Sequence, residues 1–386
     1  NSLPNHSRWK NYLGYLSTIQ RSRVFYSLNS KKNILMGKLA VKRYISLMFL
    51  IIQLVLSIFT FVGLFGGDSN PVGHTASAML VYILPILIAA NAIMLIYWLI
   101  VRHWIVTAIP VITLLCCIPY IGCLYQPGSL ADIDPTQENV KIASYNVARF
   151  GREATSFISH DILAEMKKEH VDILCIQEYN NEVGDNKNND IYKGYFPYHA
   201  TGKADMTIFS RYPIKGSKTM EFEQTNNSAM WADIDIKGKQ VRVFNVHLET
   251  TGFNRTLHQA NKMINRGQTV ETNALVNAIY GNYTLGMIIR AGQAAIVSNE
   301  VRNSNLPCIL CGDFNDVPYS YVYNTMLGNM VDGFKECGSG FMYTYRGSKA
   351  VRIDYIFHDK SIEGLNYYKL PLTYSDHFPV FMQVKL

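Results

Sequence analysis

Three long uncharged apolar runs near the N-terminus constrain this chain more than any other feature. The runs cover Tyr44–Phe65, Ala76–Val101 and Trp104–Leu124, and none contains Asp, Glu, Lys or Arg. Each has at least 21 residues, and a helix of that length crosses a hydrocarbon core of about 30 Å. One alternative is a buried helical hairpin in a soluble protein, but soluble proteins rarely contain three successive uncharged runs of this length. The other is a cleavable signal peptide, but signal peptides carry a single, shorter apolar region. We therefore expect three transmembrane helices, with the lipid bilayer as a partner.

Basic residues are concentrated before the first apolar run. Nine of the 36 Lys and Arg residues lie before Tyr44, whereas the loop 66–75 has none and carries Asp68. Asp132 and Glu138 follow the third run. Loops rich in Lys and Arg stay in the cytoplasm. A multi-pass protein of the cell membrane is therefore expected, with the N-terminus in the cytoplasm. The globular part is expected outside the cytoplasm, on the periplasmic face if the source is bacterial.

The chain divides into four expected segments. A basic cytoplasmic segment covers 1–43, a three-helix transmembrane anchor covers 44–124, a polar linker covers 125–139, and a globular domain covers 140–386. From Glu138 onward the chain has 26 basic and 26 acidic residues, so the formal net charge of +7 belongs to the N-terminal part. This balance argues against a uniformly basic surface for nucleic acid.

The globular domain has more expected strands than helices. Apolar residues recur at helical spacing over Ser156–His170 and, with an interruption near Gly281, over His258–Asn303. Short apolar or alternating stretches predict strands at Val140–Val147, Val171–Gln177, Met206–Ser210, Met230–Ile236, Gln240–Leu248, Pro307–Cys311, Arg352–Phe357 and Val380–Val384. Neighbouring strands often read as hairpins, so the expected class is α/β, with mixed sheets packed against each other and helices outside.

Polar side chains with catalytic potential stand at the ends of these strands. They are Asn146, Glu178, His247, Asp313, Asn315, Asp354, Asp376 and His377. Carboxylate and amide oxygens are the hard ligands that Mg²⁺ and Mn²⁺ prefer, and histidines beside carboxylates suit proton transfer. Each residue alone fits an ordinary turn, loop or strand position. Their occurrence together in one domain points to chemistry at a metal site.

The motifs that carry these residues resemble, in the same order, those of the endonuclease/exonuclease/phosphatase superfamily. The matching stretches are Ser-Tyr-Asn at 144–146, Gln-Glu at 177–178, Asn-Val-His-Leu at 245–248, Gly-Asp-Phe-Asn at 312–315, Arg-Ile-Asp-Tyr-Ile at 352–356 and Ser-Asp-His-Phe-Pro at 375–379. The superfamily includes deoxyribonucleases, inositol-polyphosphate phosphatases and sphingomyelinases. The resemblance covers residues 140–386 and implies a four-layer sandwich of two mixed β-sheets flanked by helices, preceded here by the three transmembrane helices.

The resemblance also implies a metal site. Asn146, Glu178 and Asp376 would hold Mg²⁺, with Mn²⁺ as the alternative, and Glu178 would be the main ligand. Ala148 stands where some members carry a further acidic ligand. The number of metal ions, one or two, therefore stays open.

Five residues would perform the chemistry by the same resemblance. Asp313 would orient and deprotonate the attacking water, and Asn315 would hydrogen-bond a phosphate oxygen. His377, held by Asp354, would contact the phosphoryl group and stabilise its charge. His247 would lie on the phosphate or leaving-group side.

The expected function is therefore metal-dependent hydrolysis of phosphoester bonds, as a phosphodiesterase or a phosphomonoesterase. A membrane-anchored nuclease acting on extracytoplasmic DNA or RNA is the alternative. An inactive membrane-tethered binding module is a weaker one, since a degenerate member would lose Glu178, Asp313 or His377 first. A transporter is disfavoured because the apolar runs lack Asp, Glu, Lys, Arg and His. Lipid headgroups, nucleotides and nucleic acids all stay candidate substrates, and no obligate protein partner is evident.

Overall fold

The described part of the chain begins with a series of helices. The computed structural model describes residues 6–133, 138–149, 157–179, 191–203, 206–223, 225–269, 271–347 and 350–386. Its N-terminal elements are α1 (His6–Phe65), η1 (Gly66–Asp68), α2 (Thr75–Met79), η2 (Leu80–Ile83), α3 (Leu84–Val101), α4 (Trp104–Cys116) and α5 (Ile118–Ile121). Three helical stretches are long and apolar enough to cross a membrane: Met36–Asp68, Thr75–Val101 and Trp104–Ile121. The three apolar helices expected from the sequence are confirmed.

Two compact units divide the chain. The first comprises Asn1–Ile58 and Ala90–Ile112, and the second comprises Phe59–Ala89 and Thr113–Leu386. The second unit thus contains parts of the apolar segments in addition to the globular domain. Ser156, where a helix was expected to begin, and residues 134–137 of the expected linker lie outside the described residues.

A buried polar cluster lies among the helices of the first unit. Gln53 Nε2 donates hydrogen bonds of 2.9 Å to Asn91 Oδ1 and to the hydroxyl of Ser57. All three side chains are buried. Hydrogen bonds of this kind help apolar helices to associate in a bilayer, where water offers no competing partner.

Two six-stranded sheets form the core of the second unit. Their strand orders are β10-β12-β9-β8-β7-β6 and β13-β14-β2-β3-β5-β4. The first sheet contains β6 (Ile214–Glu221), β7 (Ser228–Ile236), β8 (Lys239–His247), β9 (Cys308–Asp313), β10 (Val331–Asp332) and β12 (Asp354–His358). The second contains β2 (Val140–Asn146), β3 (Ile173–Gln177), β4 (Tyr198–Thr201), β5 (Thr207–Ser210), β13 (Glu363–Lys369) and β14 (Val380–Lys385). Both sheets are mixed, since β8 runs parallel to β9 and β2 parallel to β3 among antiparallel neighbours.

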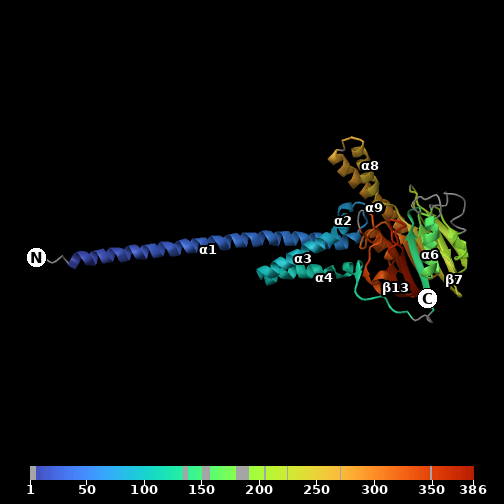
Figure 1. Ribbon diagram of the computed structural model, residues 1–386, viewed down its shortest axis with the longest axis horizontal. Coiled ribbons are helices and arrows are strands. Elements are labelled where there is room, and N and C mark those ends of the chain that lie inside the picture. Colours follow the sequence, from blue (N-terminus) through green and yellow to red (C-terminus); the bar gives the residue numbers. More distant parts are fainter. Residues whose placement is uncertain are drawn as a thin grey trace. The chain divides into compact units, whose positions relative to one another are not determined.

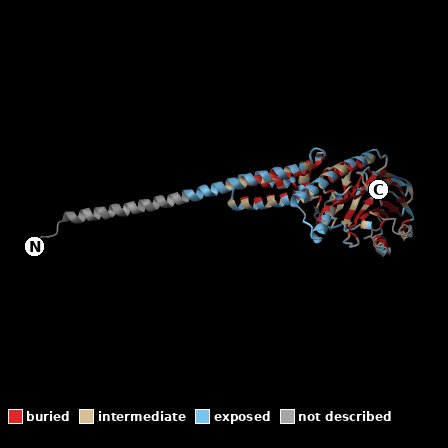
Figure 2. Cartoon of the chain, turned by 90° about the horizontal axis from the view of Figure 1, so that it is seen from above, coloured by how far each residue is buried: buried red, intermediate tan, exposed pale blue. Residues whose placement is uncertain are grey.

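The sheets pack face to face and carry helices on their outer faces (Figure 1). Ile142 of β2 and Val243 of β8 belong to one buried cluster that joins the two sheets. On the outer faces, α6 (Phe157–Lys168) covers the second sheet, while α9 (Thr272–Arg302) and α10 (Tyr321–Leu327) cover the first. Buried residues accordingly follow the strands in Figure 2. The expected four-layer α/β sandwich is confirmed.

The expected helical region between β8 and β9 forms two helices. α8 covers Phe253–Asn265, and α9 begins at Thr272. The chain turns between them at Gly267, where a φ of 74° favours glycine. Gly281, where the sequence suggested the interruption, lies inside α9. The expected position of the break was therefore wrong, because a single glycine inside a long helix is tolerated when the flanking residues propagate it.

The polar segment after the apolar helices is bound to the sandwich. Its β1 (Tyr125–Gln126) pairs with β11 (Gly340–Phe341), which follows the short helix α11 (Gly333–Cys337). Further along, the backbone N–H of Ala131 donates to Asn366 Oδ1 at 2.8 Å, and Asn366 Nδ2 donates to the Ala131 carbonyl at 2.9 Å. The described part of this segment is thus an integral border of the globular fold.

Candidate active site

The two pairs of parallel strands bring the predicted residues together. In one sheet Asn146 ends β2 and pairs in register with Gln177, the last residue of β3 before Glu178. In the other sheet His247 and Asp313 are the last residues of β8 and β9 and pair with each other. Parallel neighbours end at the same edge of a sheet. Four of the eight candidates therefore converge at one end of the sandwich.

Gly312 allows the close approach of β9 to β8. Its φ is 138°, and a Cβ at this position would lie 2.0 Å from the carbonyl oxygen of Val246. Only glycine fits such a contact, because a side chain would collide with the neighbouring backbone. The glycine in the Gly-Asp-Phe-Asn stretch thus lets Asp313 stand directly beside His247.

Asn146 links carboxylates from both sheets. Its Nδ2 donates to Asp313 Oδ2 at 3.0 Å and to Glu178 Oε1 at 3.3 Å. Glu178 has a left-handed backbone with a φ of 53°, which is uncommon outside glycine and concentrates at functional sites. The Glu178 side chain is 35% exposed, so its oxygens are open to a ligand.

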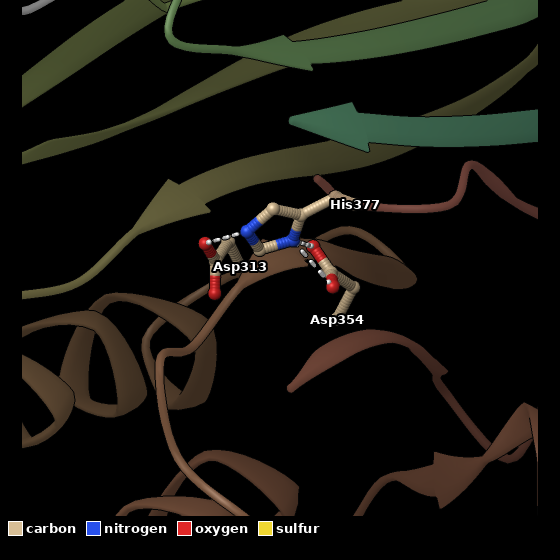
Figure 3. A group of neighbouring side chains, drawn as sticks. All are labelled: Asp313, Asp354 and His377. Carbon is tan, nitrogen blue, oxygen red and sulfur yellow. Dashed lines mark hydrogen bonds and ion pairs between the residues drawn. The ribbon is translucent and has the colours of Figure 1, made fainter. Parts of the chain in front are cut away.

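His377 and Asp354 form a buried hydrogen-bonded pair (Figure 3). The Nδ1 atom of His377 lies 2.9 and 3.2 Å from the two carboxylate oxygens of Asp354, and its Nε2 atom faces Asp313 Oδ2 at 3.7 Å. Burial alone would lower the pKa of His377, but the carboxylates of Asp354 and Asp313 outweigh it and raise the pKa to about 10. The imidazole is therefore held as a cation at neutral pH.

Asp313 is the centre of the cluster. It is 1% exposed, and burial together with the neighbouring charge of Asp354 raises its pKa to about 6, although His377 and His247 oppose the shift. Asp313, Asp354 and His377 bring potential ligand atoms within 4.8 Å of one another. A carboxylate with a pKa near 6 is suited to accept a proton at neutral pH.

His247 and Asn315 border this centre. The Nε2 atom of His247 lies 3.9 Å from both Glu178 Oε1 and Asp313 Oδ2. Asn315, also left-handed with a φ of 52°, donates its backbone N–H to Asp313 Oδ1 at 2.8 Å and its Nδ2 to the Leu248 carbonyl at 2.8 Å. Both side chains therefore lie at the cluster that the strand ends form.

Asp376 is connected to the cluster through its neighbour. The hydroxyl of Ser375 donates to the Asn146 carbonyl at 2.7 Å and lies 3.4 Å from Asp376 Oδ1. Asp376 is exposed, whereas Ser375 and His377 on either side are buried. The structure thus groups Asn146, Glu178, His247, Asp313, Asn315, Asp354 and His377 by direct contacts, and attaches Asp376 at the exposed border.

The sequence between residues 143 and 377 matches the profile of the Endonuclease/Exonuclease/phosphatase family. This match covers more than half of the chain. The protein belongs to this family. A second profile, for a domain of unknown function designated DUF8431, matches residues 46–124, the region of the apolar helices.

Several known proteins are similar to this family member. A CCR4-Not complex 3'-5'-exoribonuclease subunit, Ccr4 of Mycosarcoma maydis, is 23% identical over 301 residues, which are 62% of this chain and 41% of that protein. The chain therefore spans about two fifths of the length of this relative. Among solved structures, a mannosyl-6-phosphatase of Bacteroides thetaiotaomicron has 18% identity and a TM-score of 0.45, covering 64% of this chain and all of that chain. A humanized TDP2 of D. rerio has 14% identity and a TM-score of 0.46, covering 64% and 99%.

A buried polar layer supports the site of this family member from below. Gln177 Nε2 donates to Asn245 Oδ1 at 2.7 Å and to the Ser144 hydroxyl at 3.0 Å. Asn245 Nδ2 donates to the carbonyls of Ile176 and Thr207 at 2.9 and 3.0 Å. These bonds join β3 of one sheet to β8 of the other inside the sandwich.

The sequence carries a signal for this layer. Ser144 and Asn245 each precede a candidate, Asn146 and His247, by two residues. In a strand, residues two apart share a face. Polar side chains two positions before Asn146 and His247, in strands otherwise rich in apolar residues, therefore indicate a hydrogen-bonded layer inside the sandwich.

Proposed function

We propose that this protein hydrolyses phosphoester bonds by attack of water on phosphorus, with Asp313 as the base and a divalent metal ion held at Glu178. The observation that carries the proposal is the buried Asp313 carboxylate, whose pKa is raised to about 6 and which lies between Asn146, His377 and His247. A proton acceptor flanked by a cation and by oxygen ligands is what phosphoryl transfer to water requires.

The residues around Glu178 suit a hard cation such as Mg²⁺ or Mn²⁺. Glu178 and Asp376 offer carboxylate oxygens, the donors that Mg²⁺ or Mn²⁺ prefers. Asn146 points its Nδ2 at Glu178 and its Oδ1 at the Ala148 N–H, so its amide would have to rotate by about 180° to bind the ion through oxygen. Glu178 is partly exposed and Asp376 is exposed, so both can turn toward a ligand. When bound, the ion would supply positive charge to the phosphate oxygens and to the leaving oxygen.

The chain's own groups perform the remaining steps in this proposal. Asp313 orients the water through one carboxylate oxygen and accepts its proton. His377, kept cationic by Asp354, donates its Nε2–H to a phosphoryl oxygen, and Asn315 supplies a further hydrogen bond there. His247, 3.9 Å from both Glu178 and Asp313, serves the leaving-group side.

The proposed substrate is a small phosphoester or a lipid headgroup. The similar proteins include an exoribonuclease subunit and a mannosyl-6-phosphatase, so a membrane-anchored nuclease is the second candidate. The balance of 26 basic and 26 acidic residues after residue 137 favours a small phosphoester or a lipid headgroup over nucleic acid. An inactive binding module is disfavoured, because all eight candidate residues are present.

Turnover by the full chain in detergent micelles tests the proposed function. We expect hydrolysis of at least one member of a panel of bis(p-nitrophenyl) phosphate, p-nitrophenyl phosphate, single-stranded RNA and a phospholipid. We expect excess EDTA to abolish it and added Mg²⁺ or Mn²⁺ to restore it, because the proposed ligands are oxygens. The matched control is Glu178→Gln, which should stay inactive at any metal concentration that restores the parent protein. Full activity in EDTA would exclude the metal, and preference for RNA would select the nuclease.

We also propose that the apolar helices anchor the protein in a membrane, with the sandwich outside the cytoplasm. The support is the excess of Lys and Arg before the first apolar run and the three helices of sufficient length. An alkaline phosphatase fused after Leu386 should be active, whereas a cytoplasm-dependent fluorescent reporter at the same place should not. The opposite pair of results would reverse the orientation.

A further inference from the structure

A buried ion pair outside the predicted site contacts the segments that follow β8 and β9. Arg290 of α9 and Asp316 are 0% and 3% exposed, and Arg290 Nε donates to Asp316 Oδ2 at 3.3 Å. The hydroxyl of Tyr82 completes the group, since it donates to Asp316 Oδ1 at 2.6 Å and accepts from Arg290 Nη2 at 3.3 Å. Tyr82 lies in η2, within the second apolar run. All three residues belong to the second compact unit.

Asp316 ties this group to the loop that follows β9. It comes directly after Asn315, and its Oδ1 also accepts the backbone N–H of Val317 at 2.9 Å. Its carbonyl accepts the Tyr355 hydroxyl at 2.9 Å. The position of Asp316 therefore determines where the backbone of Asn315 lies, and Asn315 in turn donates to Asp313 Oδ1.

Arg290 ties the same group to the loop that follows β8. Its Nη1 donates to the Glu249 carbonyl at 3.0 Å, and Gln293, one turn further along α9, accepts the Glu249 N–H at 2.8 Å. Glu249 is the second residue after His247. One side chain thus spans the segments that leave both catalytic strands.

The Tyr82 hydroxyl supplies a hydrogen bond to each partner of the Arg290–Asp316 ion pair. A buried ion pair is favourable only when additional hydrogen bonds satisfy both partners, because each charge has lost its water. Tyr82 serves both partners at once, as a donor to Asp316 and as an acceptor from Arg290. Without the Tyr82 hydroxyl, Asp316 loses the shortest of its side-chain hydrogen bonds.

A second contact of the same kind reaches the other half of the site. Arg352 is fully buried, pairs with Asp332 at 2.6 Å and donates to the carbonyl of Cys123, just beyond the third apolar helix, at 3.0 Å. Arg352 is two residues before Asp354, the partner of His377. Residues of the apolar helical region therefore contact both the Asp316 segment and Arg352, which lies two residues before Asp354.

We propose that Tyr82 is a positioning residue of the active site, acting through Asp316 and Arg290 on the loops of Asn315 and His247. The inference rests on the proposed hydrolase function and extends it, since Tyr82 lies outside residues 143–377 that match the family. Activity then depends on a hydroxyl that the apolar helical region supplies. The role is one of geometry, and Tyr82 does not touch the reacting atoms.

The test compares Tyr82→Phe with Tyr321→Phe in the full chain, in detergent micelles. Tyr321 is the matched control because its hydroxyl accepts one exposed hydrogen bond of 3.5 Å from Asn70, and no hydrogen bond among the described residues joins it to the site. We expect Tyr82→Phe to lower kcat by about 10–100-fold, the scale for losing an outer hydrogen bond that orients the residues of a metal-dependent site, with little change in KM. Tyr321→Phe should match the parent protein.

Amide hydrogen exchange supplies a readout that needs no substrate. In Tyr82→Phe the peptide that contains residues 313–317 should exchange about tenfold faster, the factor expected for losing one hydrogen bond to a charged group. The same peptide should be unaffected in Tyr321→Phe. If the parent protein turns over no substrate, the proposed function fails, while exchange still decides the role of Tyr82. Unchanged exchange of 313–317 overturns the inference. Faster exchange by the same factor in all peptides also overturns it, because it would show a global loss of stability.

Discussion

Replacing Asp313 with Asn is expected to lower kcat by about 10²–10⁴-fold, the usual contribution of a general base. The carboxylate is buried between Asn146, His377 and His247, and its raised pKa of about 6 makes it a competent proton acceptor at neutral pH. Asparagine has nearly the same shape but accepts no proton from water. The loss should therefore appear in kcat while the fold persists.

The measurement is steady-state turnover together with thermal unfolding of the purified full chain. Asp235→Asn is the matched control, because it removes a carboxylate far from the site. Asp235 lies near the end of β7 opposite to Ser228, the residue that pairs with His247, and it accepts the Gly238 N–H at 2.8 Å. It should turn over like the parent protein. A folded Asp313→Asn protein with near-parental kcat would show that another group takes the proton.

Replacing His377 with Ala should reduce kcat by a comparable factor of about 10²–10⁴, because the variant loses the cation that contacts the phosphoryl group.

The pH profile of the parent protein should reflect both groups. Activity needs Asp313 ionised, so it should fall as the pH drops through about 6. It also needs His377 protonated, so it should fall as the pH rises through about 10. The parent profile of kcat/KM is therefore expected to be a broad bell.

Asp354→Asn separates the charge of the pair from its shape. The variant keeps an oxygen that can accept from His377 Nδ1 but removes the carboxylate that raises the pKa of His377. The alkaline limb should then move down toward about 6.5, the ordinary value for histidine. The acid limb should also move down, because the charge of Asp354 contributes to the raised pKa of Asp313. An alkaline limb that does not move would show that His377 is not the group titrating there.

The fold was predictable where strands are buried on both faces and less so at the sheet edges. β3 and β9 are fully buried and read as apolar runs in the sequence. The strands β6 and β13, which lie at sheet edges, were not predicted. Their sequences mix Lys, Ser, Thr, Glu and Asn with few buried positions. An edge strand needs only one apolar face and one neighbour, so its sequence carries a weaker pattern.

The candidate residues were predictable because they follow recognisable strands, whereas their supports were not. Asp313 and His247 could be placed from the strand ends alone. Arg290 lies in the middle of a long helix, and Tyr82 lies in an apolar run where a tyrosine reads as an interfacial or buried ring. Their meeting with Asp316 joins segments more than 200 residues apart. No local pattern encodes such a contact.

Gly67 has a consequence for how this protein could have been assembled during evolution. Its backbone lies against that of Tyr319, so that a Cβ at Gly67 would fall 1.7 Å from the Tyr319 carbonyl oxygen. Asp68 beside it accepts from Asn324 at 3.0 Å. A sandwich domain joined to an unrelated helical region would lose this fit together with the hydrogen bond from Tyr82. The apolar helical region and the sandwich domain are therefore expected to have been inherited together. Substitutions at 67 or 82 should be accompanied by changes at 319 or 316 among descendants of the same ancestor.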